Sequence, residues 1–456
     1  MPNITIDNHT YDLDTLSDDA RAQLQSLQFV DAELARLQTQ IVVLHTARIA
    51  YAQELAALSV LAPKPVQVAA PVANPHPPVG APLAPDVPTV LLVTYQWSTL
   101  VEIPYLVKQA GCHVDVLCPS DNATLKNSFY DRWIDSGASM ETLIAALQQL
   151  ASAKTYDHIL IGDDPIFWAI YRDKLTDLWP LLPILNPAAL PILNKIGFSE
   201  HCRRHGIASP KFYPIAQSRD APAALQLLGM PLVVKENYSN GGAGVRIFQD
   251  ESSYLEFMNA YDYAEPLLAQ QLIVGEQLCT EALFKHGQLL QYVCSVDIEP
   301  TLGPSTKRRY MPKDVAIGSI LKLLGQSAML HGFVNVSVMK ETRSQRYYLF
   351  EADPRPNKWV SYAKWFGHDF APAFKAFMAD KEVDLLHSSP SGTPQDIDCW
   401  EVEYFPNYAA KLLNEGRTPE AILHLLDFKK NWRYTLYDPV LLEDKLDCIR
   451  RGVKFA

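Results

Sequence analysis

Three patterns of apolar and polar residues follow one another along the chain, and each predicts a different structure. Residues 4–13 alternate apolar and polar side chains around a central Asn-His pair, which predicts a short β-hairpin. Over residues 27–58 the apolar side chains recur at two positions of a seven-residue repeat, with Arg48 as the polar exception. This repeat predicts a coiled-coil helix that joins copies of the chain through residues 25–60. The alternative is one amphipathic helix folded back on its own protein.

Residues 62–88 are rich in proline and nearly free of large side chains. Such a segment cannot build a core, so it predicts an extended, semi-rigid linker. Beyond it the pattern becomes that of packed helices and strands. The expected domains are a hairpin plus coiled coil at 1–61, the linker at 62–88, a parallel-sheet α/β domain at 89–190, an α+β domain at 191–380 and a mostly helical extension at 381–456.

Within residues 89–190, apolar runs that read as strands alternate with helical patterns. The expected strands are Thr89–Thr94, His113–Cys118 and His158–Gly162, and the expected helices are near Val101–Ala110 and at Met140–Ser152. This order predicts a parallel sheet with ligands near the carboxyl ends of its strands. The loop at 96–99 and the pair Asp163-Asp164 lie at such ends. They are candidate substrate contacts, with an ordinary turn and a helix cap as the alternatives.

The pattern after residue 190 predicts a helix and then antiparallel strands. The helix covers Asn194–His205, and the remainder from Phe370 onward is expected to be mostly helical. The expected strands are Pro231–Glu236, Leu267–Ile273, Cys279–Phe284, Gln288–Val296, Gly332–Met339 and Arg346–Ala352.

Length, composition and charge limit the class of protein. A chain of 456 residues with 48% hydrophobic side chains predicts two or three domains with sizeable cores. Its net charge of −11 gives no basic surface for nucleic acid or anionic lipid, and no apolar run approaches the roughly 20 residues that span a bilayer. The cysteines number seven and show no CxxC spacing, so we expect reduced thiols in a cytoplasmic protein.

The segment Tyr347–Trp359 holds the strongest chemical signal. Alternate residues of a strand share a face, so Glu351 and Asp353 are expected to project together at the strand's end, with Arg355 just beyond. Two carboxylates suit Mg²⁺, and a guanidinium beside them suits a phosphate or a carboxylate. The alternative is an ion pair at a strand end.

A glycine-rich loop is the second signal. Gly241, Gly242 and Gly244 follow a strand that ends near Lys235, so backbone N–H groups and an ammonium could meet one anionic ligand. Lys195 opens a helix and could add a second positive charge. The alternatives are an ordinary hairpin turn and a solvated surface lysine.

In this order along roughly residues 88–380, the motifs resemble the ATP-grasp superfamily, and within it the carboxylate–amine (or carboxylate–thiol) ligases. The fold implied is a parallel-sheet pre-ATP-grasp domain at 89–190 followed by a two-lobed ATP-grasp fold at 191–380. The resemblance implies ATP and Mg²⁺ as cofactors. It implies that Lys195 and Lys235 contact the ATP phosphates and that Gly241, Gly242 and Gly244 form a closing flap. The hinge that binds adenine would be Gln270, Gln271, Leu272 and Ile273, and Glu276 or Gln277 would contact the ribose.

By the same resemblance, Glu351 and Asp353 bind the metal and Arg355 stabilises phosphoryl transfer. The chain departs from the family pattern at three places. Gln277 stands where an acidic residue is favoured, Ser337 stands where a Gln, Glu or Asp metal ligand is usual, and Asp353 stands where Asn is usual. Asp353 could supply the carboxylate that Ser337 lacks, and weakened magnesium binding is the alternative.

The function these residues predict is an ATP-dependent ligase that joins a carboxylate, activated as an acyl phosphate, to an amine. Arg308 and Arg309 are candidates for gripping the acid, with a solvated loop as the alternative. We call Glu351, Asp353 and Arg355 the metal motif. The aromatic segment that follows it, Trp359–Phe370, resembles that of biosynthetic ligases for amino-acid-like or surface-polymer compounds. The alternatives are a nucleotide-binding scaffold assembled by the coiled coil and a phosphotransferase that acts on a hydroxyl.

Overall fold

The structure is a computed structural model, and it describes residues 3–6, 9–12, 24, 87–298, 307–379, 401–403, 407–426 and 438–451. The chain divides into two compact units, Met1–Ala73 and Asn74–Ala456. In the first unit, strands β1 (Asn3–Ile6) and β2 (His9–Asp12) pair antiparallel, with Ile4 opposite Tyr11. The predicted coiled coil and nearly all of the predicted linker lie outside the described residues.

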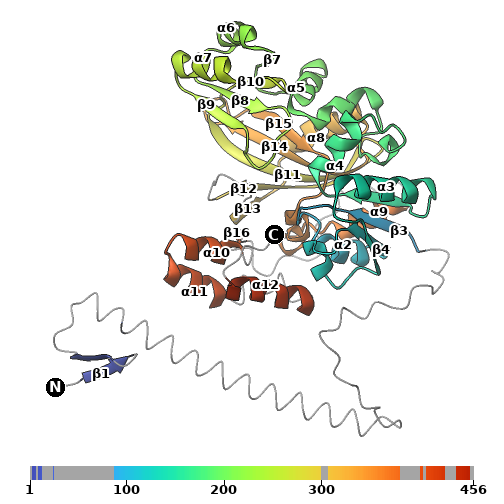
Figure 1. Ribbon diagram of the computed structural model, residues 1–456, viewed down its shortest axis with the longest axis vertical. Helices are drawn as coiled ribbons and strands as arrows, with labels where there is room; N and C mark the ends of the chain where they lie inside the picture. The colour runs from blue at the N-terminus through green and yellow to red at the C-terminus, as the bar shows by residue number, and fades with distance from the viewer. Residues whose placement is uncertain are drawn as a thin grey trace. The chain divides into compact units, whose positions relative to one another are not determined.

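The second unit begins with a four-stranded parallel sheet, which confirms that prediction (Figure 1). The strand order is β5-β4-β3-β6, and the carboxyl ends of all four strands therefore meet at one edge. The elements of this domain are β3 (Thr89–Val93), α2 (Ile103–Gln109), β4 (His113–Cys118), η1 (Ala123–Lys126), β5 (Arg132–Asp135), α3 (Met140–Ser152), β6 (His158–Ile161), α4 (Asp164–Arg172), η2 (Trp179–Leu181) and η3 (Pro187–Leu193).

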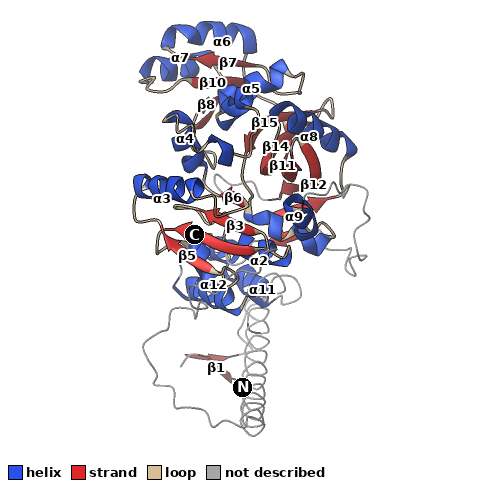
Figure 2. Cartoon of the chain, turned by 90° about the vertical axis from the view of Figure 1, so that its right-hand side faces the viewer, coloured by secondary structure: helices blue, strands red, loops and turns tan. Residues whose placement is uncertain are grey.

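Both faces of this parallel sheet are buried, because alternate side chains of its central strand enter different cores. Val90 and Leu92 of β3 pack with α2, whereas Leu91 and Val93 pack with α3 and α4. Figure 2 shows α3 and α2 on either side of the sheet. Burial on both faces explains why the strand reads as a continuous apolar run rather than an alternation.

Two antiparallel lobes follow the α/β domain. The small lobe is a four-stranded antiparallel sheet, drawn at the top of Figure 1. Helices α6 and α7 close its apolar face, where Tyr254 and Met258 are fully buried. The strand order is β7-β10-β8-β9. The elements are α5 (Lys195–Arg204), β7 (Phe212–Ile215), η4 (Ser218–Asp220), α6 (Ala221–Leu228), β8 (Leu232–Glu236), β9 (Val245–Phe248), α7 (Glu251–Ala260) and β10 (Leu267–Gln271).

The large lobe is a six-stranded antiparallel sheet in the order β15-β14-β11-β12-β13-β16. Helix α8 covers one face through Ile317 and Leu321, and helix α9 covers the other through Phe374 and Phe377. The elements are β11 (Gly275–Lys285), β12 (Gln288–Asp297), β13 (Lys307–Met311), α8 (Val315–Ala328), β14 (Gly332–Glu341), β15 (Tyr347–Asp353), η5 (Lys358–Ser361), η6 (Ala363–Phe366), α9 (Ala371–Met378) and β16 (Glu401–Glu403).

The described C-terminal helices are α10 (Asn407–Asn414), α11 (Thr418–Leu426) and α12 (Pro439–Arg451). Helix α12 attaches to the α/β domain, because Lys445 forms a fully buried ion pair with Glu102 and Asp438 accepts a 2.6 Å hydrogen bond from the Ser128 N–H. The C-terminal extension is therefore part of the packed second unit.

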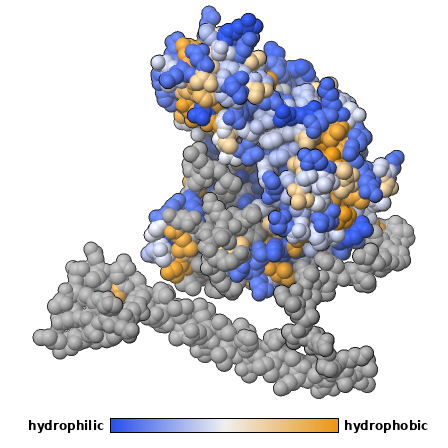
Figure 3. Space-filling model, in the orientation of Figure 1, coloured by the Kyte–Doolittle hydropathy of each residue, from blue (hydrophilic) through white to orange (hydrophobic). Residues whose placement is uncertain are grey.

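The described surface is mixed in character. Figure 3 shows apolar residues in small separate patches among polar ones, as is normal for a folded protein. Among the described helices, none is both long enough and apolar enough to cross a membrane.

Candidate functional site

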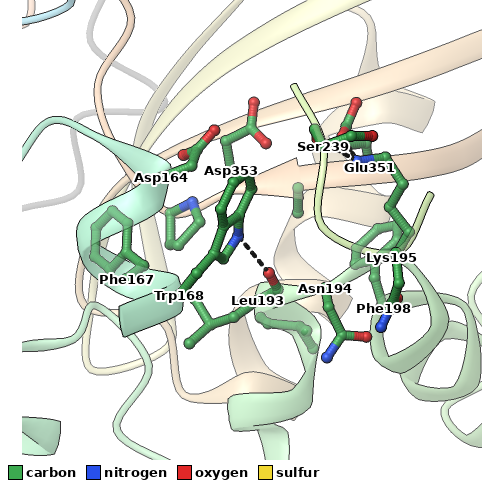
Figure 4. Close-up of a pocket in the computed structure, with 14 residues that line it drawn as sticks. Asp164, Phe167, Trp168, Leu193, Asn194, Lys195, Phe198, Ser239, Glu351 and Asp353 are labelled. Atoms are coloured by element: carbon green, nitrogen blue, oxygen red, sulfur yellow. Dashed lines mark hydrogen bonds and ion pairs between the residues drawn. The ribbon is translucent and has the colours of Figure 1, made fainter. Parts of the chain in front are cut away.

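The polar end of β15 forms one wall of a pocket between the two lobes and the α/β domain. Glu351 lies opposite Ser337 of β14, and Asp353 lies opposite Asn335, so both carboxylates lie on the same face of the large sheet. The pocket is shown in Figure 4. Its lining comes from β15, α4, η3, α5 and the loop after β8, and includes Asp164, Trp168, Asn194, Lys195, Asn237, Ser239, Glu351 and Asp353.

Lys195 contacts both Glu351 and the segment that leads into the glycine-rich loop. It is the first residue of α5, whose N-cap Asn194 accepts a hydrogen bond from the Gly197 N–H. Its Nζ lies 3.0 Å from Glu351 Oε1 and also donates to the Ser239 carbonyl oxygen (Figure 4). The structure therefore brings these two sequence-predicted residues into one ion pair, although 156 positions separate their numbers (351 − 195).

Lys235 is a buried lysine that packs against β15, the strand of Glu351 and Asp353. Its Nζ lies 4.6 Å from the ring centroid of Phe350. Burial lowers the pKa of Lys235 to about 8, because the charged ammonium loses its water; the charge of Glu351 opposes the shift and Lys195 adds to it. A phosphate placed beside Lys235 and Lys195 would stabilise both charged forms.

The glycine-rich loop is the turn of the β8–β9 hairpin. Gly241, Gly242 and Gly244 all have positive φ, at 57°, 80° and 71°. A side chain at Gly244 would also meet the Glu236 carboxylate at 2.7 Å. Nothing lies within 4 Å of the place where a Cβ would stand at Gly241 or Gly242, so the tip of the loop exposes its backbone.

Arg355 is held by residues of the α/β domain. Its Nε and Nη2 donate to Asp164 Oδ1 and Oδ2 at 2.6 and 2.8 Å, and Nη2 also lies 3.3 Å from Asp353. The guanidinium lies 5.1 Å from the centroid of the Trp97 ring. Burial, followed by the nearby charge of Asp164, raises the pKa of Asp353, and Arg355 counteracts part of that effect. The sequence had offered Asp164 only as a contact or a cap.

Its neighbour Asp163 has a structural role. One carboxylate oxygen accepts hydrogen bonds from the N–H groups of Tyr95, Gln96 and Trp97 at 3.0, 2.8 and 3.0 Å, and the other accepts from Thr94 Oγ1 at 2.6 Å. Asp163 therefore fixes the loop at 96–99, which in turn places Trp97 beside Arg355.

The predicted hinge and ribose residues lie apart from the described pocket lining. Gln270 is buried and its Nε2 donates to Ser199 Oγ at 3.2 Å, so its side chain supports α5. Ile273 is buried, and Glu276 and Gln277 are exposed at the start of β11. Gln271 and Leu272 are half-buried. Among the residues described as lining the pocket at Glu351, none comes from 270–277.

Arg308 lies on β13 and is 4% exposed, so the solvated-loop alternative is wrong for this residue. Its Nη1 lies 3.2 Å from Glu281 and its Nε lies 3.1 Å from Asp297, and the guanidinium stacks at 4.8 Å on Trp359. Arg309 is exposed on the same strand.

Glu281 is a buried carboxylate near these residues that the sequence did not single out. It is 1% exposed on β11, and its Oε1 accepts from Asn335 Nδ2 at 2.7 Å as well as facing Arg308. The register aligns Glu281 with Asn335 and Asn335 with Asp353, so a polar row crosses the sheet from the metal motif toward Arg308. The signal was a charged residue inside the mostly apolar run at 278–284.

The residues present fit Mg²⁺ with few protein ligands. Within the described parts of the chain, no three His, Cys, Asp or Glu side chains converge on one metal position. Glu351 and Asp353 are two carboxylates on one face, and the half-buried Asp353 lies near the charge of Asp164, which a cation would stabilise. Mg²⁺ commonly takes one or two carboxylates and completes its shell with water and phosphate oxygens.

The comparisons with solved structures concern the fold. The N5-carboxyaminoimidazole synthetase of Staphylococcus aureus complexed with ADP aligns with a TM-score of 0.50 at 16% identity, over 64% of this chain and 78% of that chain. The biotin carboxylase domain of the Hydrogenobacter thermophilus 2-oxoglutarate carboxylase, in complex with MgADP and bicarbonate, aligns with a TM-score of 0.50 at 14% identity, over 64% and 70%. These likenesses support an ATP-grasp fold.

Curated relatives match a shorter part of the chain. The carbamoyl phosphate synthase large chain of Kineococcus radiotolerans is 24% identical over 230 residues, which is 45% of this chain and 20% of that protein. The corresponding protein of Bifidobacterium animalis subsp. lactis is 25% identical over 236 residues, 44% and 20%. This chain thus spans about a fifth of the length of these relatives. No family model matches the chain.

Proposed function

We propose that the protein is an ATP-dependent ligase that activates a substrate carboxylate as an acyl phosphate and joins it to an amine. The observation that carries the proposal is the meeting of Asp164, Lys195, Glu351 and Asp353 at one pocket, from three separate segments of the chain. Arg355 is bound to two of these residues, Asp164 and Asp353. The ADP and MgADP complexes of the similar structures add support.

Within this proposal, Glu351 and Asp353 hold Mg²⁺, and Lys195 and Lys235 bind the phosphates of ATP. The metal neutralises the charge of the phosphates when it is bound. Phosphoryl transfer needs alignment and charge neutralisation rather than a protein nucleophile, so a pocket of cations and carboxylates is sufficient for the chemistry. Arg355, fixed by Asp164, is placed to stabilise the oxygens of the transferring group.

The substrate carboxylate, which accepts the phosphoryl group, would bind at the end of the polar row, next to Arg308. A carboxylate substrate would compete with Glu281 and Asp297 for the buried guanidinium of Arg308. The reaction then balances as follows: the substrate carboxylate takes the γ-phosphoryl group from ATP and releases ADP, and the amine displaces phosphate to form an amide. The loop at Gly241–Gly244 would cover the acyl phosphate from water.

The test is ADP release over panels of carboxylates and amines, with Glu351→Gln as the blank. We expect ADP release that requires a carboxylate and rises with an amine, and hydroxylamine should trap the intermediate as a hydroxamate. ADP release with hydroxyl acceptors and no hydroxamate would indicate a phosphotransferase. ADP binding without any turnover over the whole panel would leave the nucleotide-binding scaffold.

A further inference from the structure

A second cavity lies between the α/β domain and the segment that follows the metal motif. Its volume is about 270 Å³, and its lining comes from α2, η5, η6 and the start of α9. Helix α2 packs against both η5 and α9 in this region. This second cavity shares no described lining residue with the pocket at Glu351. Ligand cavities commonly begin at about 300 Å³, so this one suits a molecule of amino-acid size.

The floor of this cavity is apolar and buried. Leu106 of α2 and Val360 of η5 belong to the same buried core, at 4% and 1% exposure, and Ala371 of α9 is 6% exposed beside them. Ser361 Oγ donates to the Glu102 carbonyl oxygen at 3.2 Å, which fastens η5 to the start of α2. The apolar surface is thus already formed, and binding a ligand there needs no collapse of the core.

One wall carries an aromatic ring and a positive charge. The Nζ of Lys364 lies 4.1 Å from the centroid of the Tyr105 ring, and Phe129 packs edge-on against the same ring at 4.9 Å. Partial burial lowers the pKa of Lys364, and the charge of Asp369 opposes the shift. An ammonium that has lost part of its water favours an anionic ligand.

The carboxylate of Asp369 supplies the opposite charge at the exposed side of the cavity. Its Oδ1 accepts a 2.9 Å hydrogen bond from the Ala371 N–H, which fixes the carboxylate before α9. Lys364 and Asp369 both line this cavity, so it carries one positive and one negative side chain.

We propose that this cavity is a separate binding site for a zwitterionic small molecule, an amino acid with an apolar side chain. Lys364 pairs with the carboxylate of the ligand, Asp369 pairs with its ammonium, and Leu106, Val360 and Ala371 receive its side chain. The ligand would then touch η5, which begins five residues after Asp353 in the metal motif (358 − 353). This inference goes beyond the proposed function and does not depend on ATP turnover.

The experiment is calorimetric titration of the full-length protein without nucleotide, using L-leucine and L-phenylalanine as probes. The controls for recognition are leucinamide, which lacks the carboxylate, and 4-methylpentanoate, which lacks the ammonium. We expect L-leucine or L-phenylalanine to bind and both leucine analogues to bind at least ~10-fold more weakly, since each loses one charged hydrogen-bonded contact.

Four variants locate the ligand. Lys364→Met and Leu106→Trp should each weaken binding at least ~10-fold, the first by removing the charge and the second by filling the floor. Lys375→Met, an exposed lysine on α9, and Glu351→Gln should bind as the unaltered protein does. If Leu106→Trp fails a thermal-unfolding check, Asp369→Asn at the exposed edge replaces it.

Two results would overturn the proposal. One is no binding of either probe, nor of any other apolar amino acid, at about 10 mM ligand, well above a ~1 mM dissociation constant. The other is binding that Glu351→Gln abolishes and the cavity variants retain, which would place the ligand in the pocket at the metal motif. A protein that binds leucine here but never releases ADP would refute the proposed ligase and leave this site standing.

Discussion

The guanidinium of Arg355 forms a bidentate pair with the carboxylate of Asp164, through hydrogen bonds of 2.6 and 2.8 Å. Both side chains are more than nine-tenths buried, and 191 positions separate them in the sequence. The arginine that follows the metal motif is therefore positioned by the first residue of α4, a helix of the α/β domain. A bidentate pair of this kind fixes the orientation of the guanidinium as well as its charge.

Asp164→Asn tests whether this contact positions Arg355 for the reaction. The amide keeps the shape but loses the charge and one acceptor oxygen, so we expect kcat for ADP release to fall about 10- to 100-fold, or ~1.4–2.7 kcal/mol of activation free energy. The matched control is Asp115→Asn, which breaks a similar pair with Arg132 inside the α/β domain.

Both variants should lose stability, because each removes the charge of a buried carboxylate that pairs with an arginine. Only Asp164→Asn should lose turnover in the fraction that remains folded. Equal kcat values for the two variants would show that the contact with Arg355 is merely structural.

The two carboxylates of the metal motif should respond differently to neutral substitutions. Glu351→Gln should abolish Mg²⁺-dependent ADP release, since it removes the charge of the half-buried carboxylate proposed to hold the metal. Asp353→Asn should retain activity within about tenfold, because an amide oxygen can still ligate Mg²⁺. Comparing Mg²⁺ titrations of the two purified variants measures this difference, and a greater loss in Asp353→Asn would contradict it.

Asp353→Asn should also stabilise the fold. The pKa of Asp353 is raised, chiefly by burial and then by Asp164, so the folded state binds this proton more tightly than the unfolded state does. Its contribution to stability is therefore lost as pH rises above the unfolded pKa of the carboxyl. The variant should gain more free energy of unfolding at pH 7 than at pH 4, measured by urea denaturation. An equal effect at the two pH values would argue against a raised pKa.

Ser337→Glu adds a carboxylate directly opposite Glu351 on the neighbouring strand. If the metal lies on this face, the Mg²⁺ concentration for half-maximal ADP binding should fall about tenfold, a gain of ~1.4 kcal/mol. Ser337→Gln is the control for size without charge. No change in either variant would place the metal away from Ser337.

Nucleotide affinity should fall above pH 8 because of Lys235. A lysine with a pKa of about 8 is charged below that pH and neutral above it, and only the charged form attracts phosphate. We expect Mg·ADP to bind about tenfold more weakly at pH 9 than at pH 7, roughly one unit of proton linkage. Calorimetric titration of the unaltered protein at the two pH values measures this.

Two substitutions isolate the lysine. Lys235→Arg stays charged at both pH values and should bind with little pH dependence. Lys235→Met should bind weakly at both. A steep dependence that persists in Lys235→Met would mean that another group titrates.

The N-terminal heptad predicts an assembly. Removing residues 1–61 should lower the mass of the particle measured by light scattering without abolishing ADP binding, since the candidate site lies wholly within Asn74–Ala456. Ile41→Asp within the heptad is the point-substitution control, because a charge at a core position opposes helix pairing. An unchanged mass in both would favour a helix folded back on its own chain.

The local pattern of the sequence was enough for most elements of the packed second unit. The strands His113–Cys118 and His158–Ile161 and the helix Met140–Ser152 follow from runs and periods of a few residues. Strand β5, helix α4, helix α8 and strand β13 are among the elements that were missed. Strand β13 carries Lys307, Arg308 and Arg309 in a row, so its charge resembles that of a loop, and only burial against Glu281 and Asp297 explains it as a strand.

By itself the sequence determined that Glu351 and Asp353 share one face, because the two-residue repeat of a strand is a local property of the backbone. It also determined that glycines stand where positive φ is required. The tertiary structure alone decided that Lys195 reaches Glu351, that Asp164 grips Arg355, and that Lys364 and Asp369 flank a cavity against α2. Those contacts join segments whose approach is set by the burial of apolar side chains over whole domains, and no short-range pattern in the chain specifies it.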